Sequence, residues 1–109
     1  MYKLEGKKVV KCLPGELPDP KDRIIFRDTF SIYGEDVLVS TVFLFSDHGF
    51  DGTPLLFETM IFGGKHDQYC MRYSTWEEAE LGHEESCQMA LAVVVNDRED
   101  KINKILKDE

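Results

Sequence analysis

Two pairs of metal-ligating side chains repeat at the same spacing in the second half of the sequence. Three residues separate His66 from Cys70, and three residues separate His83 from Cys87. On a helix such a pair lies one turn apart on the same face, so imidazole and thiolate could bind a tetrahedral zinc ion there, with the other pair supplied by a loop. A four-ligand zinc site is therefore one hypothesis. For Cys87 the favoured alternative is packing in the core, because a free cysteine behaves as a small apolar residue. Cys70 is expected to be a partly buried thiol in a loop.

An acid within an otherwise apolar segment suggests a second group of candidate residues. Glu58 lies in the apolar run 55–62, where an unpaired buried carboxylate would be costly. It could form a structural ion pair with a histidine or with Arg72, or it could act as a general base or metal ligand beside His48. We favour the ion pair for Glu58 and a surface or loop-capping role for His48. The alternative is an acid–base or metal-dependent enzyme that uses His48, Glu58 and His83.

The sequence contains neither a nucleophile elbow nor a phosphate-binding loop. Gly-x-Ser-x-Gly does not occur, and Gly63-Gly64 follows an apolar run without the Gly-x-Gly-x-x-Gly spacing or a following Lys-Ser/Thr. These two glycines are expected to form a turn with positive φ angles. Motifs therefore assign no catalytic residue and no cofactor.

The elements that must position the candidate residues divide the chain into an arm at 1–22, a β-meander at 23–74 and a helical part at 75–109. Three of the four prolines fall in the arm. Because proline lacks a backbone donor and restrains its neighbour, we expect an extended or irregular segment there, with at best an edge strand at 7–12.

β-branched and aromatic residues, punctuated by turn signals, fill the second part of the chain. They predict strands at 24–33, 37–45 and 55–62, a tight turn at 34–36 and a short further strand at 71–73. The second of these strands is apolar on both faces. It should therefore lie centrally and be covered on both sides, or form an interface on one side.

The helical part begins with a capping box, in which the Thr75 hydroxyl can accept from the backbone amide of Glu78 while the Glu78 carboxylate reaches back. Residues at spacings of three and four define one helix face, namely Trp76, Ala79, His83, Cys87, Ala90 and Val94. A helix is predicted from about 76 to about 95, with a break at Asn96-Asp97 before a short terminal helix. The sequence thus predicts a single-domain α+β fold, an antiparallel β-meander of three to four strands packed against one long C-terminal helix.

Size and charge exclude several classes of function. The 109 residues suffice for one domain, and 13 basic against 21 acidic residues give a net charge of −8, which repels nucleic acid. No apolar run approaches the roughly 18 to 20 residues of a membrane span. Three cysteines without a Cys-x-x-Cys pair favour a reducing compartment. We therefore expect a cytoplasmic protein with no nucleic-acid or membrane partner.

Charged and apolar residues are separated along the chain. Ten of the 21 acids lie from position 77 onward, whereas 37–64 contains three. The acidic helix face supplies the candidate binding residues Glu77, Glu80, Glu84 and Glu85. Five phenylalanines between positions 43 and 62 exceed what one thin sheet and helix layer buries. Part of this surface is therefore expected to form an oligomer or partner interface.

Several ordered stretches carry a resemblance to known proteins. They are VSTVFL at 39–44, Asp47-His48, LFETMIFGG at 56–64, RYSTWEEAE at 72–80 and Gly82-His83. Through these stretches, which span about residues 37–83, the chain resembles a group of small uncharacterised proteins encoded by bacteriophages and prophages. The resemblance implies a viral origin and the cytoplasm of a bacterial host. It implies no activity and no functional residue.

Three functional hypotheses follow. The first is a phage accessory protein that binds a host protein and inhibits an antiviral defence such as CRISPR, because acidic side chains can occupy a groove made for phosphates. The second is the small enzyme described above. The third is a minor phage structural or assembly factor. Self-association into a homo-oligomer is compatible with each.

Overall fold

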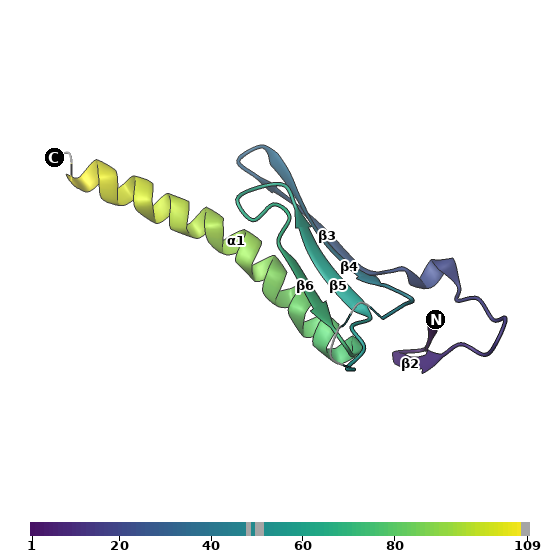
Figure 1. Cartoon of the computed structure of the whole chain (residues 1–109). Helices are drawn as coiled ribbons and strands as arrows, with labels where there is room; N and C mark the ends of the chain where they lie inside the picture. The colour runs from purple at the N-terminus through teal and green to yellow at the C-terminus, as the bar shows by residue number, and fades with distance from the viewer. Residues whose placement is uncertain (48, 50–51, 108–109) are drawn as a thin grey trace.

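A four-stranded antiparallel sheet in the order β3-β4-β5-β6 forms the centre of the molecule (Figure 1). The computed structural model describes residues 1–47, 49 and 52–107 and, within the last helix, side chains as far as Ala92. The strands are β3 (Ile24–Ile32), β4 (Glu35–Phe43), β5 (Phe57–Phe62) and β6 (Cys70–Tyr73). The predicted meander and the α+β class are confirmed, and the short further strand is present as β6.

The turn between β3 and β4 lies slightly earlier than predicted. Ile32 pairs with Glu35, and the two residues between them, Tyr33 and Gly34, have φ angles of 52° and 81°. Positive φ at both central positions is typical of a two-residue turn whose twist matches that of its strands. Glu35 and Asp36 therefore belong to β4, and the predicted turn at 34–36 is wrong in its bounds.

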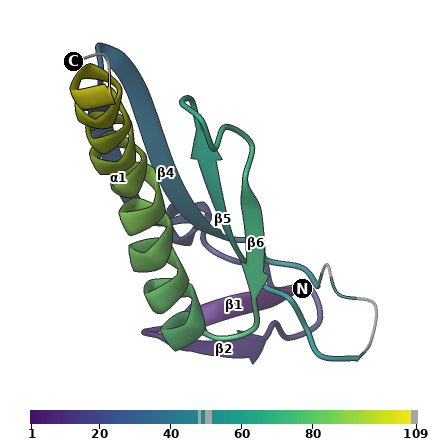
Figure 2. The same ribbon diagram turned by 90° about the vertical axis from the view of Figure 1, so that its left-hand side faces the viewer.

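Side chains of β4 and β5 alternate between the two faces of the sheet. On β4 and β5 the buried positions are Val37, Val39, Thr41, Phe43, Phe57, Thr59 and Ile61. The residues between them, such as Ser40 and Val42, are half-buried on the opposite face. Because a single helix packs on the buried face, β4 is central but is fully covered on one side only (Figure 2). Phe43 and Phe57 are core residues, Phe62 is exposed, and Phe50 lies outside the described residues.

The helix α1 (Trp76–Lys107) lies along this face of the sheet and continues beyond it (Figures 1 and 2). Its start contains the predicted pair of Thr75 and Glu78, but the Glu78 carboxylate accepts from the Thr75 hydroxyl. The Glu78 amide donates to the Thr75 hydroxyl oxygen at 3.1 Å, and this hydroxyl donates to the Glu78 carboxylate at 3.0 Å. The described part of α1 contains no stretch that is both long and apolar enough to cross a membrane.

The predicted break at Asn96-Asp97 is wrong, because α1 is continuous to Lys107. Asn and Asp each cost less than about 0.7 kcal/mol relative to Ala inside a helix. Neither glycine nor proline, the residues that end helices, occurs after Gly82. The separate terminal helix is therefore a continuation of the long one.

The N-terminal residues form a hairpin of their own, made of β1 (Tyr2–Glu5) and β2 (Lys8–Lys11) around Gly6 at φ 62°. The edge strand predicted at 7–12 is thus present as β2, but it pairs with β1 instead of joining the meander. A backbone bond from Tyr2 N–H to the Phe45 carbonyl at 2.7 Å ties this hairpin to the end of β4. The irregular arm follows it and contains the 3-10 turn η1 (Pro20–Asp22).

The core consists of two apolar clusters. One contains Val37, Val39, Ile61 and Ala90. The other contains Phe43, Leu56, Phe57 and Ala79. On each element the residues between these clusters are polar and buried, namely Thr41 on β4, Thr59 on β5, and His83 and Ser86 on α1. A polar layer therefore crosses the helix–sheet interface between two apolar ones.

Candidate functional site

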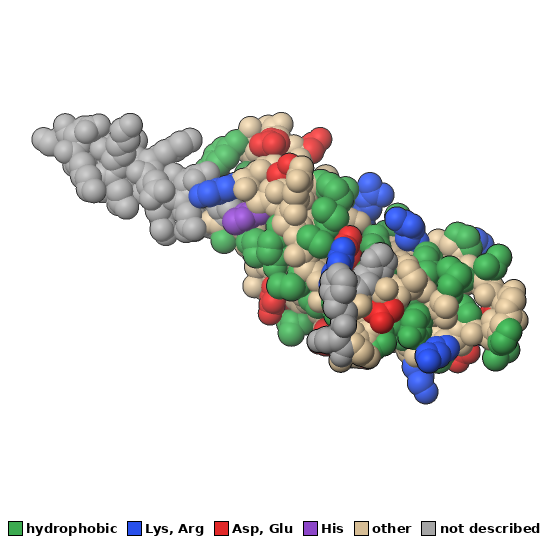
Figure 3. Space-filling model, viewed as in Figure 1, with side chains coloured by type: hydrophobic (Ala, Val, Ile, Leu, Met, Phe, Trp, Pro, Cys, Tyr) green, Lys and Arg blue, Asp and Glu red, His purple; other side chains and the backbone are tan. Residues whose placement is uncertain are grey.

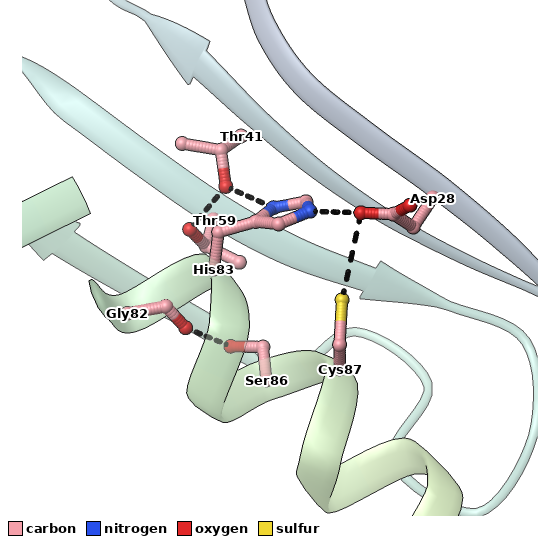
Figure 4. Close-up of polar contacts among 7 residues, drawn as sticks. All are labelled: Asp28, Thr41, Thr59, Gly82, His83, Ser86 and Cys87. Atoms are coloured by element: carbon pink, nitrogen blue, oxygen red, sulfur yellow. Dashed lines mark hydrogen bonds and ion pairs between the residues drawn. The ribbon is translucent and has the colours of Figure 1, made fainter. Parts of the chain in front are cut away.

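The polar layer contains a continuous chain of hydrogen bonds from the core to the surface (Figure 4). The hydroxyl oxygens of Thr59 and Thr41 are 2.6 Å apart, and Thr41 Oγ1 is 2.7 Å from Nδ1 of His83. On the other side of the ring, Nε2 of His83 is 2.7 Å from Oδ2 of Asp28. Strand pairing explains this arrangement, because Thr41 faces Thr59 across β4 and β5 while Asp28 faces Val39 across β3 and β4.

The protonation of His83 follows from its neighbours. The side chain of Asp28 is 54% exposed and its carboxylate can only accept, so Nε2 of His83 carries a proton and donates it to Asp28. In the neutral ring Nδ1 then accepts from the Thr41 hydroxyl. In a protonated ring Nδ1 donates instead, and the rotatable hydroxyls of Thr41 and Thr59 reverse their direction. The chain can therefore satisfy His83 in more than one protonation state.

Cys87 lies one helical turn after His83 and contacts the same carboxylate. Its Sγ is 3.8 Å from Oδ2 of Asp28 (Figure 4). Burial, and secondarily the nearby Asp28 charge, raise the pKa of the Cys87 thiol to about 11. The thiol is therefore protonated at neutral pH and is a poor nucleophile.

The order Thr41, His83, Asp28 has the connectivity of a nucleophile, a base and an orienting acid. A nucleophile must also reach its substrate, and Thr41 is 0% exposed beneath α1. The chain of hydrogen bonds can hold and relay a proton, but its hydroxyl end meets no solvent. Its accessible end is Asp28.

Tyr73 and Gly82 form a close contact beside this chain. The tyrosine ring crosses α1 at Gly82, where a Cβ atom would overlap the phenolic oxygen and two ring carbons. Burial raises the pKa of Tyr73, and hydrogen bonds with Thr59 and Ser86 partly oppose the increase. Glycine is therefore required at position 82 by packing against β6.

The structure separates the residues of the suggested acid–base group. Glu58 lies on the face of β5 opposite to Thr59, and its Oε2 forms an ion pair with Nε of Arg72 at 2.9 Å. His83 lies on the other face of the sheet, within the polar layer. The ion pair predicted for Glu58 with Arg72 is present, Glu58 and His83 are not brought together, and His48 lies outside the described residues.

The structure brings together two of the four residues suggested as zinc ligands. Within the described part of the chain, His83 and Cys87 form a group with Asp28, and neither His66 nor Cys70 belongs to it. Cys70 is an exposed residue of β6, so the prediction of a partly buried loop thiol is wrong. Partial loss of hydration of its sulfur and the nearby Glu58 raise the pKa of its thiol. The two helix residues thus lie together, as their spacing indicates, and neither residue of the predicted second pair joins them.

The residues that the sequence missed are Asp28, Thr41 and Thr59. One signal was available, because Asp28 interrupts the alternating apolar positions Phe26, Phe30 and Ile32, just as Glu58 interrupts those of β5. The two threonines gave no signal, because threonine is an ordinary strand residue.

The acidic helix residues form an exposed surface. Five exposed side chains lie at alternating spacings of four and three along the side of α1 that faces away from the sheet, and we call them the acidic stripe: Glu77, Leu81, Glu84, Gln88 and Leu91. Glu80 and Glu85 are also exposed and flank it on either side. On the face drawn in Figure 3, most Lys and Arg side chains lie over the right-hand half of the molecule, which carries β1 and β2, and others lie near its centre and near α1.

A groove of about 630 Å³ lies between the N-terminal hairpin and the start of α1. Its lining includes Tyr2, Val9, Leu56 and Trp76. In the part of the chain that the structure describes, the indole Nε1 of Trp76 is buried without a hydrogen-bond partner. The ring packs edge-on against Phe26 and is primarily a core residue.

No protein-family model, curated protein sequence or solved structure matches the chain. Function is therefore inferred from the residues themselves.

Proposed function

We propose that the protein acts by binding another protein, and that the acidic stripe of α1 docks onto a basic surface of this partner. The observation that carries the proposal is the exposure of two leucines on the same side of α1 as Glu77 and Glu84. Leu81 is 58% exposed and Leu91 is 45% exposed, on the side of α1 that the sheet does not cover. Apolar side chains repeated on one face of a helix are the anchors by which an amphipathic helix docks into a groove, and we propose this role for the two leucines.

The stripe has the geometry of a helix that presents anchors to a groove. Leu81 and Leu91 are ten residues apart, which is about 15 Å along the helix axis. Glu84 and Gln88 lie between them and Glu77 precedes them. A partner would therefore offer two apolar depressions about 15 Å apart, with lysine or arginine side chains between and around them.

The charge of the molecule supports this choice of partner. The net charge is −8, so a basic surface is attracted over a distance set by the ionic strength. A second copy of the chain is a less suitable partner for the acidic stripe, because it would bring the same acidic side chains to the contact. Binding should accordingly weaken as salt is added.

We further propose, from the sequence stretches at 37–83 alone, a phage origin for the chain and hence a bacterial protein as the partner. A basic groove that normally holds nucleic acid fits the stripe best, and a CRISPR-type antiviral defence contains such grooves. We therefore propose inhibition of a host defence as the biological outcome. Expression of the protein should restore phage plating on a host that carries the defence, and unchanged plating would contradict this part of the proposal.

Charge reversal on the stripe tests the binding surface. The double variant Glu80→Lys/Glu84→Lys should lose the partner in pull-down from bacterial lysate and in titration with the purified partner. The control Asp19→Lys/Asp36→Lys makes the same change in net charge at exposed positions away from α1 and should bind as the wild type does. Equal loss in both variants would show that only net charge matters, and equal retention would place the contact elsewhere.

A further inference from the structure

Three side chains of different chemistry meet where α1 passes the edge strand β3. They are the carboxylate of Asp28, the imidazole of His83 and the thiol of Cys87, and one ligand atom from each lies within 4.8 Å of the other two. Oδ2 of Asp28 is the shared neighbour, 2.7 Å from Nε2 and 3.8 Å from Sγ. Figure 4 shows both helix side chains pointing toward this oxygen.

We propose that Asp28, His83 and Cys87 bind one zinc-class divalent metal ion. In a tetrahedral zinc site the metal–ligand distances are about 2.0 to 2.3 Å, which separates neighbouring ligand atoms by about 3.3 to 3.8 Å. The distance between Asp28 and Cys87 already satisfies this geometry. The distance between Oδ2 of Asp28 and Nε2 of His83 must increase from 2.7 Å by about 0.6 Å, and a rotation of the exposed carboxylate provides this increase.

The hydrogen-bond chain behind His83 supports metal binding. A histidine that binds metal through Nε2 must carry its proton on Nδ1 and donate it to an acceptor. Thr41 Oγ1 lies 2.7 Å from Nδ1 and can accept, because its own hydroxyl can donate to Thr59 at 2.6 Å. These threonines are therefore positioning residues that hold the ring in place for the ion.

The choice of metal follows from the donor set. Thiolate and imidazole favour zinc, cobalt and similar ions, whereas magnesium and calcium require oxygen donors. Binding releases the thiol proton of Cys87 and the Nε2 proton is transferred to Nδ1, so each donor offers a lone pair. Three protein ligands leave the fourth position to water, which can reach the ion beside Asp28.

This site is independent of the acidic stripe. His83 and Cys87 lie on the packed side of α1, and a metal there joins β3 to the helix without involving Glu77, Glu84 or the exposed leucines. Failure of metal binding would therefore leave the proposed docking surface untouched.

Cobalt provides a direct test. Reduced, chelator-treated protein titrated with Co²⁺ should develop a thiolate-to-cobalt charge-transfer band and the intense visible bands of tetrahedral Co²⁺, saturating at one ion per chain and displaced by Zn²⁺. Cys87→Ser should abolish the charge-transfer band. Cys70→Ser, at an exposed thiol on β6, is the matched control and should retain it.

Asp28→Asn keeps the shape of the side chain and should weaken Co²⁺ binding by more than about 10-fold. Loss of a residue that only supports a metal ligand already weakens binding by about 10-fold or more, and loss of a ligand should weaken it further. Circular dichroism of each variant separates loss of a ligand from loss of the fold. Absence of the charge-transfer band in the wild type would overturn the proposal, and so would a band that survives Cys87→Ser.

Discussion

Replacement of Gly82 by alanine should destabilise the protein, although glycine is normally the worse residue inside a helix. At an exposed helix position this change stabilises by about 0.5 to 1 kcal/mol, because glycine has more conformational entropy to lose. Gly82 is buried, and a Cβ atom there would overlap the phenolic oxygen and two ring carbons of Tyr73. The sign of the effect should therefore be reversed.

The magnitude follows from what must move. Ring atoms cannot give way as the end of a flexible side chain can, and forcing extra volume into a packed core costs about 1 to 3 kcal/mol. Subtraction of the helix-propensity gain leaves a net destabilisation of about 1 kcal/mol for Gly82→Ala, and at most about 2.5 kcal/mol. Urea unfolding followed by circular dichroism would measure this loss as a lower midpoint with an unchanged slope.

A double-mutant cycle isolates the contact. In a Tyr73→Ala background the overlapped atoms are gone, so Gly82→Ala should there stabilise by about 0.5 to 1 kcal/mol as in an ordinary helix. Tyr73→Phe retains both ring carbons and should relieve little of the strain. If Gly82→Ala stabilised the wild-type background, or had the same effect in both backgrounds, the close packing of β6 on α1 would be refuted.

Three further predictions concern single side chains. Thr75→Ala should lower the free energy of unfolding by about 1 kcal/mol through loss of the helix cap, and Thr75→Ser should retain most of it, both measured by urea unfolding. Glu58→Gln should cost less than about 1 kcal/mol, because its ion pair with the partly exposed Arg72 is a surface pair, and a larger cost would indicate another role. Burial raises the pKa of Tyr73 above its usual 10.0, so above about pH 10 the unfolded state releases the phenolic proton first and stability falls as the pH rises. Tyr73→Phe should show a smaller fall over the same range, and an identical fall would contradict the assignment to Tyr73.

The sequence predicted the elements whose signals are local. The meander follows from β-branched runs separated by turn residues. The start of α1 follows from Thr75 and Glu78, where the Glu78 amide donates to the Thr75 hydroxyl as predicted. The end of α1 was predicted wrongly because Asn96-Asp97 is only a weak helix breaker. The β1–β2 hairpin was missed because its strands are four residues each and rich in lysine.

The candidate site could be predicted only in part, because it depends on strand register. The spacing of His83 and Cys87 is visible in the sequence, but Asp28 lies 55 residues before His83. The pairing of β3 with β4 determines which residues of β3 face α1. This pairing depends on the turn between the two strands, and the sequence predicted that turn one residue away from its true position. A shift of one residue would have turned Asp28 to the opposite face of the sheet.

Site-specific photo-crosslinking in bacterial cells tests whether the partner docks on the exposed face of α1. A photoreactive amino acid at position 81 or 91 should yield one discrete crosslinked partner, lost when the same chain carries Glu80→Lys/Glu84→Lys. The same amino acid at Leu13 or Leu17, exposed residues of the N-terminal arm, should not yield this product. Crosslinking of one partner from position 13 or 17, with none from 81 and 91, would contradict the account.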